Sequence, residues 1–335
     1  MISVVCPFYN EESIIEGAVR LMLDNLSRLD DDWELIIVND GSKDTSPRIA
    51  RELEMANEKL RVVSYSRNRG RGYAIRKGVE EANGDLVVTT EIDSSWGDDI
   101  VERILEKFRE TPDADIVIAS PHLPGGGYRN VPAFRTLLST LGNYVIRAGL
   151  TYDVTMNTGM TRGYKREKFL QLPLDEDEKE MHLEIVNKAL SFGYRIVEIP
   201  AILEWRDKKL TAPKAKTRKS SAKINKLIRT HVLFSLLAAP FRYLYVVAAL
   251  VGLLSAGFFS LAVINLFTDV PSIYFLLVAM MLGMFAVLTF GIGILAQQGR
   301  TLVREMWRMR SELRSGDAAG RRPHVPAFYE DSIAD

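Results

Sequence analysis

Two carboxylates, Glu91 and Asp93, are separated by one residue at the end of an apolar run, and Ser95 follows them. When a strand ends, carboxylates at this spacing are able to turn toward one ion. Hard cations such as Mg²⁺ or Mn²⁺ prefer oxygen ligands and usually share them with substrate phosphates. The alternative is an acidic loop that caps the next helix, a task that also suits Asp98 and Asp99. The triplet alone leaves both interpretations open.

Three more polar segments follow apolar runs in this part of the chain: Tyr9–Glu12, Asp40–Asp44 and Asn68–Gly72. The Asp40 carboxylate is able to accept hydrogen bonds from the edge of a nucleotide base, whereas Asp44 and Ser46 also suit an ordinary turn before a helix. The glycines of the third segment let the backbone approach phosphate or ribose. Arg69 and Arg71 lie beside them, with a solvated basic turn as the alternative.

Alternating strands and helices are expected to position these segments. Apolar runs predict strands at Ile2–Pro7, Glu34–Asn39, Arg61–Tyr65, Asp85–Thr90 and Asp115–Ala119. Helical windows near residues 12–29, 46–58, 72–83 and 98–109 alternate with them. Such alternation predicts an α/β fold with a mostly parallel sheet covered on both faces. Ligands bind beyond the carboxyl ends of such strands, so the four polar loops should meet at one edge and favour metal–diphosphate binding.

Beyond residue 120 the pattern is less regular. Residues 121–132 predict a loop and residues 152–163 an irregular stretch, whereas helices are expected at 133–148 and 177–192 and a strand at 195–204. Residues 216–241 are basic and then apolar. This composition predicts a helix that lies in a membrane interface, with a plain helical linker as the alternative.

Two long apolar runs near the C-terminus, Tyr243–Phe267 and Ser272–Ala296, contain no Lys, Arg, Asp or Glu. As a helix, each is long enough to cross the ~30 Å hydrocarbon layer. The short link between them predicts a transmembrane hairpin over residues 242–298. Basic residues flank both outer ends and the link has none, so the positive-inside rule predicts that the domain at 1–215 and the basic tail at 299–335 are cytoplasmic. The part of the tail after Ser315 is expected to be loosely ordered.

The composition excludes several other classes. Lys and Arg balance Asp and Glu at 43 each, and the basic residues gather around the apolar runs, which favours anionic headgroups or phosphates over nucleic acid. The loop after the first strand has no glycine until Gly17, which argues against a dinucleotide-binding dehydrogenase. The four histidines are too scattered for a zinc cluster. Cys6 is the only cysteine, so an intrachain disulfide is excluded.

The ordered loops resemble those of family 2 glycosyltransferases, above all dolichyl-phosphate mannose synthases and polyprenyl-phosphate glycosyltransferases. The motifs that carry the resemblance are Pro7–Glu12, Val38–Asp44 and Asn68–Gly72 with Gly78, and the similarity extends over about residues 2–215. The resemblance implies a GT-A fold, a nucleotide-sugar donor and Mg²⁺ or Mn²⁺ as the cofactor.

The resemblance also implies roles for individual residues. The nucleotide sugar would be bound by Pro7, Tyr9, Glu11, Asp40, Arg71, Glu91 and Asp93, with Asp40 on the base. Glu91 and Asp93 stand at the family's Asp-x-Asp, and Ser95 lies near a third polar metal ligand. The acceptor phosphate would be held by Arg129, Arg135, Ser139, Arg162 and Lys214, and catalysis would rest on Asp93, Arg135 and Arg206. Glu184 matches an acidic helix residue of the family.

The expected activity is an inverting transfer of a hexose from a nucleotide sugar to a polyprenyl or dolichyl phosphate at the cytosolic face of the cell membrane. GDP-mannose is the favoured donor and UDP-glucose the next. Glu91 replaces the usual Asp, and Pro121 stands where the family has Arg. Two alternatives therefore stay open: transfer to a lipid or glycan hydroxyl with Asp153 or Glu184 as base, and an inactive scaffold. The expected partners are the donor, the lipid and the bilayer, and the sequence leaves homo-oligomerisation open.

Overall fold

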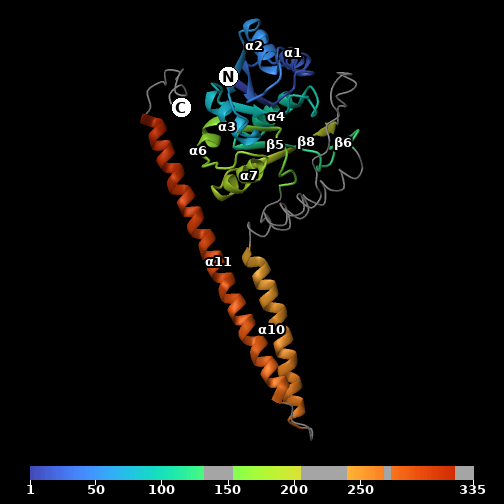
Figure 1. Cartoon of the computed structure of the whole chain (residues 1–335), viewed down its shortest axis with the longest axis vertical. Helices are drawn as coiled ribbons and strands as arrows, with labels where there is room; N and C mark the ends of the chain where they lie inside the picture. The colour runs from blue at the N-terminus through green and yellow to red at the C-terminus, as the bar shows by residue number, and fades with distance from the viewer. Residues whose placement is uncertain (132–153, 205–239, 268–272, 321–335) are drawn as a thin grey trace.

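The computed structural model describes residues 1–131, 154–204, 240–267 and 273–320 (Figure 1). The predicted helix at 133–148 and the predicted interface helix at 216–241, apart from its last two residues, lie outside these ranges.

A seven-stranded sheet forms the centre of the α/β domain, with the order β3-β2-β1-β4-β7-β5-β8. Its strands are β1 (Ile2–Phe8), β2 (Trp33–Asp40), β3 (Leu60–Tyr65), β4 (Leu86–Thr89), β5 (Ile116–Ser120), β7 (Arg162–Lys165) and β8 (Ile196–Pro200). Neighbouring strands are parallel except for β7, which runs antiparallel to both β4 and β5. The five strands predicted in the first 120 residues are confirmed. Every residue of β2 is buried, as expected for a strand covered on both faces.

The helices that connect these strands are α1 (Ile15–Leu26), α2 (Ser46–Met55), α3 (Arg71–Glu81), α4 (Ile100–Glu110), α6 (Arg166–Gln171) and α7 (Met181–Ser191). Apolar residues at helical spacing turn one side of each long helix to the sheet, as Ile100, Ile104 and Phe108 do in α4. The observed order of strands and helices confirms the predicted α/β class.

The sequence interpretation was wrong in three places between residues 121 and 204. The stretch predicted to be irregular contains the start of β7. The sequence does not predict this strand because Arg162–Lys165 lacks the apolar character of a buried strand. A Cβ on Gly163 would lie 2.4 Å from Ile104 Cγ2, so only glycine lets α4 pack this closely. The loop at 121–132 contains β6 (Gly127–Arg129), and the single strand expected at 195–204 is two strands. Its second part, β9 (Ile202–Glu204), pairs with β6 in a separate small sheet.

Two helices project together from the α/β domain (Figure 1). They are α10 (Pro240–Asn265) and α11 (Ile273–Gly320), which pack against each other. Each helix contains a stretch that is long and apolar enough to cross a membrane, Tyr243–Asn265 in α10 and Ile273–Trp307 in α11. Most side chains of these two stretches are not buried. The two expected apolar helices are confirmed, and their crossing of a membrane stays a prediction. However, α11 is one helix to Gly320, so the start of the tail that was expected to be loose after Ser315 is helical.

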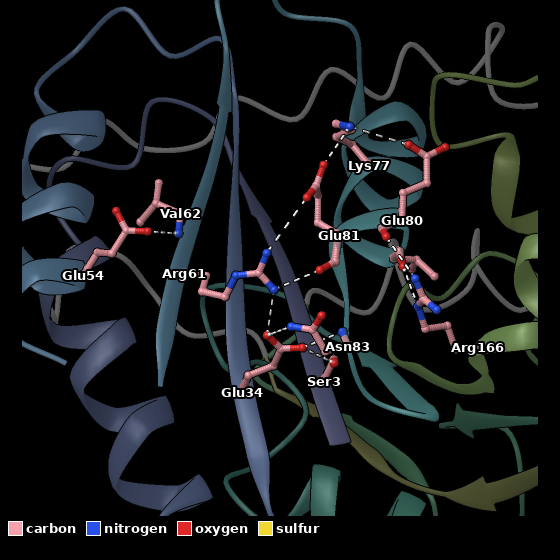
Figure 2. Close-up of polar contacts among 11 residues, drawn as sticks. Ser3, Glu34, Glu54, Arg61, Val62, Lys77, Glu80, Glu81, Asn83 and Arg166 are labelled. Carbon is pink, nitrogen blue, oxygen red and sulfur yellow. Dashed lines mark hydrogen bonds and ion pairs between the residues drawn. The ribbon is translucent and has the colours of Figure 1, made fainter. Parts of the chain in front are cut away.

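A buried polar network closes the edge of the sheet where β1, β2 and β3 begin (Figure 2). The Glu34 carboxylate accepts hydrogen bonds from Ser3 Oγ (2.6 Å), the Asn83 backbone N–H (2.7 Å) and Arg61 Nη1 (2.9 Å). Burial alone would raise the pKa of Glu34, but these three donors outweigh it and lower the pKa. The network therefore holds three strands and the end of α3 in register at the edge opposite the polar loops.

Candidate functional site

Hydrogen bonds join the loops that follow β1 and β2. The Asn10 backbone N–H donates to Ser42 Oγ (2.9 Å), and the Lys43 N–H donates to Asn10 Oδ1 (2.8 Å). Asn10 adopts a left-handed conformation with φ 53°, which turns the chain sharply after the strand. Tyr9 is left 41% exposed at this turn, while Pro7 is half-buried beneath it.

Asp40 joins the loops that follow β2 and β3. Its carboxylate accepts hydrogen bonds from Tyr65 Oη (2.8 Å), Asn68 Nδ2 (2.9 Å) and the backbone N–H groups of Arg69 (2.8 Å) and Gly70 (3.1 Å). The residue is only 5% exposed. The structure therefore gives Asp40 a role in building the loop, and its contact with a nucleotide base stays a prediction.

The glycines of the third loop pack tightly against a segment from far along the chain. A Cβ on Gly70 would lie 2.6 Å from the Asp177 carbonyl oxygen, and one on Gly72 would lie 2.7 Å from the Glu178 carbonyl oxygen. The Tyr73 N–H donates to that same Asp177 oxygen (3.0 Å), and Arg76 pairs with the Asp177 carboxylate. The close backbone approach that the sequence assigned to phosphate is thus made, in this structure, to residues 177–178.

The Glu91–Ser95 turn brings the predicted metal ligands together after β4. Ser95 Oγ donates to Glu91 Oε2 (2.7 Å), and the Ser95 N–H donates to Asp93 Oδ1 (3.2 Å). Arg71, at the start of α3, places Nη1 3.7 Å from Glu91 Oε1. The sequence prediction that these loops meet at one edge is therefore correct for the third and fourth loops.

The first loop reaches the same place. Burial raises the pKa of the Cys6 thiol, and the charges of Asp93, Glu91 and Glu11 raise it further, so carboxylates of the first and fourth loops act on the same group. Glu11 comes from the loop after β1, whereas Glu91 and Asp93 come from the loop after β4. Because β1 and β4 are adjacent parallel strands, their carboxyl ends must carry these side chains to one edge.

The donor atoms suit a hard divalent cation that is shared with a substrate. Among the residues in the described ranges, no group of three or more His, Cys, Asp or Glu side chains is placed to hold a metal alone. Mg²⁺, however, is usually bound by one or two carboxylates together with substrate phosphates. Glu91 and Asp93, both half-buried, supply such carboxylates, and Ser95 adds a hydroxyl. The site fits a metal that arrives with a diphosphate.

The predicted acceptor residues are only partly within the described ranges. Arg135, Ser139, Arg206 and Lys214 lie outside them, as does Asp153. Arg129 is exposed at the end of β6. The small sheet to which β6 belongs joins the metal-site turn, because the Glu204 N–H of β9 donates to the Ser95 carbonyl oxygen (2.7 Å).

Arg162 lies inside the domain instead. It is fully buried and donates to the carbonyl oxygens of Asn157 (2.8 Å) and His182 (3.0 Å). Burial, followed by the charges of Arg162 and Arg71, lowers the pKa of His182 well below its ordinary value, so the imidazole is neutral at pH 7. The Arg162 guanidinium therefore holds β7 to the start of α7, and its contact with the acceptor phosphate stays a prediction.

Two further residues that shape the site had no clear signal in the sequence. Tyr65, at the end of β3, donates a hydrogen bond to Asp40. The Asp177 carboxylate pairs with Arg76, and its Oδ2 lies 3.6 Å from Arg69 Nη2. Both contacts join residues far apart in the chain, so no local pattern marks them. Glu184 and Lys188 form a buried pair (2.6 Å) at the i,i+4 spacing, which is readable from sequence. Glu184 also accepts the backbone N–H groups of Asp175 and Glu176.

Comparisons with known proteins agree with the geometry. The model of the family described as glycosyl transferase family 2 matches residues 3–172, just over half of the chain. Undecaprenyl-phosphate 4-deoxy-4-formamido-L-arabinose transferase of Pectobacterium atrosepticum is 28% identical over 207 residues, covering 62% of this chain and 60% of that protein. Dolichol-phosphate mannosyltransferase of Pyrococcus furiosus is 28% identical over 138 residues, covering 41% and 38%. Matches to three further curated glycosyltransferases cover 33%, 33% and 37% of those proteins.

A solved structure supports the fold. Glucosyl-3-phosphoglycerate synthase of Mycobacterium tuberculosis, in complex with UDP, superposes with a TM-score of 0.51 at 22% identity, covering 71% of this chain and 79% of that one. At this identity the likeness concerns the fold alone. The α/β domain thus has the architecture of a known nucleotide-sugar transferase.

Proposed function

The chain belongs to glycosyl transferase family 2, and from this premise we propose that it transfers a hexose from a nucleotide sugar to a polyprenyl or dolichyl phosphate. Membership of this family identifies the chain as a glycosyltransferase. The acceptor is suggested by relatives whose names specify undecaprenyl phosphate or dolichol phosphate. GDP-mannose is the favoured donor and UDP-glucose the next.

One observation carries the proposal: loops from four successive strands meet at one edge, where Arg71 Nη1 lies 3.7 Å from Glu91 in the turn that also holds Asp93. A nucleotide sugar presents a flat base, a ribose and a negatively charged diphosphate. The exposed Tyr9 ring and the half-buried Pro7 offer apolar contact for the base and ribose. Arg71 offers a cation for the diphosphate.

A Mg²⁺ or Mn²⁺ ion held by Glu91, Asp93 and Ser95 would neutralise the charge that develops on the departing nucleoside diphosphate. Solved relatives of this fold in complex with Mn²⁺ and UDP support such a requirement. The chain's own contribution is to hold the diphosphate in one orientation through the loops that Asp40 and residues 177–178 fix in place.

The proposed chemistry needs no strong base. A lipid monophosphate has a second pKa of about 6, so at neutral pH an ionised oxygen is ready to attack the anomeric carbon. As that bond forms, the bond from the anomeric carbon to the diphosphate oxygen breaks, and the nucleoside diphosphate leaves with the electron pair. A single displacement inverts the anomeric centre. We assign the binding of the incoming phosphate to Arg129 together with Arg135, Ser139 and Lys214, and further cationic support to Arg206.

The hairpin explains why such an enzyme carries apolar helices. The polyprenyl chain of the acceptor stays in the bilayer, so the site must be held at the membrane surface. We propose that α10 and α11 cross the cell membrane and that the α/β domain and both chain ends are cytoplasmic. The basic flanks, which include Arg300 and Arg304, support this orientation.

Transfer by the purified full-length protein tests the function. Protein in detergent is mixed with Mn²⁺, a panel of labelled nucleotide sugars, and dolichyl or undecaprenyl phosphate. We expect labelled lipid that depends on Mn²⁺, and Asp93→Ala should abolish it while leaving the thermal unfolding midpoint unchanged. Transfer only to lipid or glycan hydroxyls would replace the proposed acceptor, and neither transfer nor donor hydrolysis would indicate an inactive scaffold.

A further inference from the structure

The last part of α11 leaves the apolar hairpin and lies along the α/β domain, against α6 (Figure 1). The apolar stretch Ile273–Trp307 has 35 residues, which as a helix measures about 52 Å and exceeds the ~30 Å layer. Its final turns must therefore stand outside the layer, and Arg300 marks the first charge. We call residues 300–320 the α11 extension.

Trp307 of the α11 extension contacts Lys188 of α7. Trp307 is half-buried, and its ring lies 4.9 Å from Lys188 Nζ, within the range of a cation–π interaction. Its neighbours differ, because Met306 is 62% exposed and Met309 is 56% exposed. Among the described side chains of the α11 extension, Trp307 is thus the one that makes a cation–π contact with the α/β domain.

The Lys188 ammonium is a buried group with a defined set of partners. Its side chain is 5% exposed, it pairs with Glu184 (2.6 Å), and it donates to the Pro173 carbonyl oxygen. Glu184 in turn accepts the N–H groups of Asp175 and Glu176, both at 3.0 Å. The Lys188–Glu184 pair therefore fixes the backbone of residues 173–176.

That backbone continues directly into the donor site. The Asp177 carboxylate pairs with Arg76, and the Asp177 carbonyl oxygen accepts a hydrogen bond from the Tyr73 N–H. The carbonyl groups of residues 177–178 pack on Gly70 and Gly72. Arg71, which lies between these two glycines, is the residue beside Glu91. Packed and hydrogen-bonded contacts therefore run without a break from Trp307 to the 68–72 loop.

We propose that Trp307 is a positioning residue that docks the α11 extension on α7 and thereby holds residues 173–178 against the 68–72 loop of the donor site. The inference rests on the proposed function for its effect on catalysis, because that loop is the one we assign to the nucleotide sugar. Since α11 also supplies the second membrane span, the docked extension ties the donor site to the membrane anchor.

Hydrogen exchange of the full-length protein without substrate tests the docking. We expect Trp307→Ala to speed amide exchange in peptides covering 173–178 and 68–72 by roughly two- to tenfold, the range that a cation–π contact represents. Trp307→Tyr keeps an aromatic face for Lys188 and should restore most of the protection. Met306→Ala, one residue earlier on an exposed side, is the matched control and should exchange as the wild type does.

Kinetics provide the second readout. Trp307→Ala should raise the KM for the nucleotide sugar by a similar factor and leave kcat and the KM for the lipid nearly unchanged. Wild-type exchange in Trp307→Ala at either segment, an equal effect of Met306→Ala, or an unchanged KM for the donor would each overturn the proposal. If the wild-type protein transfers no sugar, the proposed function fails, whereas the exchange measurement still decides whether Trp307 holds the loop.

Discussion

Replacing Asp40 with Asn separates a loop-building role from a ligand contact. The new amide has one N–H₂ group, and in either orientation this group faces two hydrogen-bond donors. In one orientation the donors are Asn68 Nδ2 and the Gly70 N–H. In the other they are Tyr65 Oη and the Arg69 N–H. Tyr65 is able to turn its hydroxyl and accept instead, but the backbone N–H groups are not. At least one hydrogen bond to a charged acceptor is therefore lost or weakened in a site that is 5% exposed.

The loss is large enough to measure. A hydrogen bond to a charged group contributes about 1.5–3 kcal/mol. If loop opening becomes easier by that amount, amide exchange at residues 69–70 should rise roughly 10- to 150-fold. Hydrogen exchange read by mass spectrometry on peptides covering 66–73 reports it, and nucleotide-sugar binding is measured on the same protein. The control is Asp85→Asn, whose side chain is 95% exposed at the opposite edge of the sheet.

The two readouts distinguish the two roles. Fast exchange together with weaker nucleotide binding is the expected result, because the loop supports the donor site. Unchanged exchange with weaker binding would refute the reasoning, since it would mean that the Asp40 oxygens serve the ligand and the loop holds without them.

Two further predictions concern stability. Glu34 has a lowered pKa in the folded chain, so its contribution is present above its ordinary value of 4.5 and is lost as the pH falls through the lower folded value. Glu34→Gln should therefore reduce the free energy of unfolding by about 1–3 kcal/mol at pH 7, and urea titrations should show the difference shrinking below pH 4. Gly78→Ala places a Cβ 2.4 Å from Val5 Cγ1 and should destabilise the protein by about 1–3 kcal/mol through overpacking, despite the better helix propensity of Ala. A thermal unfolding midpoint equal to that of the wild type would show that α3 shifts away from β1 at little cost.

The strands and polar loops of the first 120 residues are predictable because four of the five strands there, β1, β2, β4 and β5, are buried on both faces. The edge strand β3 is only partly buried. Val4, Leu35 and Val87 belong to apolar runs that end in charged or turn-forming residues, and the parallel sheet places those ends together. The sequence therefore predicts which residues reach the edge. It does not predict β7, because Arg162 and Gly163 are central in the sheet for reasons of tertiary packing, a buried guanidinium and a close helix.

The roles of residues within the site are harder to read from sequence than their places. The motif around Gly70 and Gly72 is visible, but whether a glycine approaches a phosphate or another backbone depends on where residues 177–178 fold, more than 100 positions later. The same holds for Asp40, whose partners come from the following loop. The length of α11 is a simpler case, because its charged residues are also good helix formers and a change in polarity does not end a helix.

Hydrogen-bond satisfaction separates the carboxylates that build the sheet from those that are available for chemistry. Glu34 and Asp40 are 4% and 5% exposed, and each accepts at least three short hydrogen bonds from its own chain. Glu91 and Asp93 are half-buried, and among the described residues each has one hydrogen bond, from Ser95, with Arg71 at the longer distance of 3.7 Å from Glu91. A buried carboxylate with all its lone pairs occupied has no capacity left for a ligand. A partly exposed pair with open lone pairs, placed where four loops meet, keeps acceptor capacity for a divalent cation that arrives with a diphosphate.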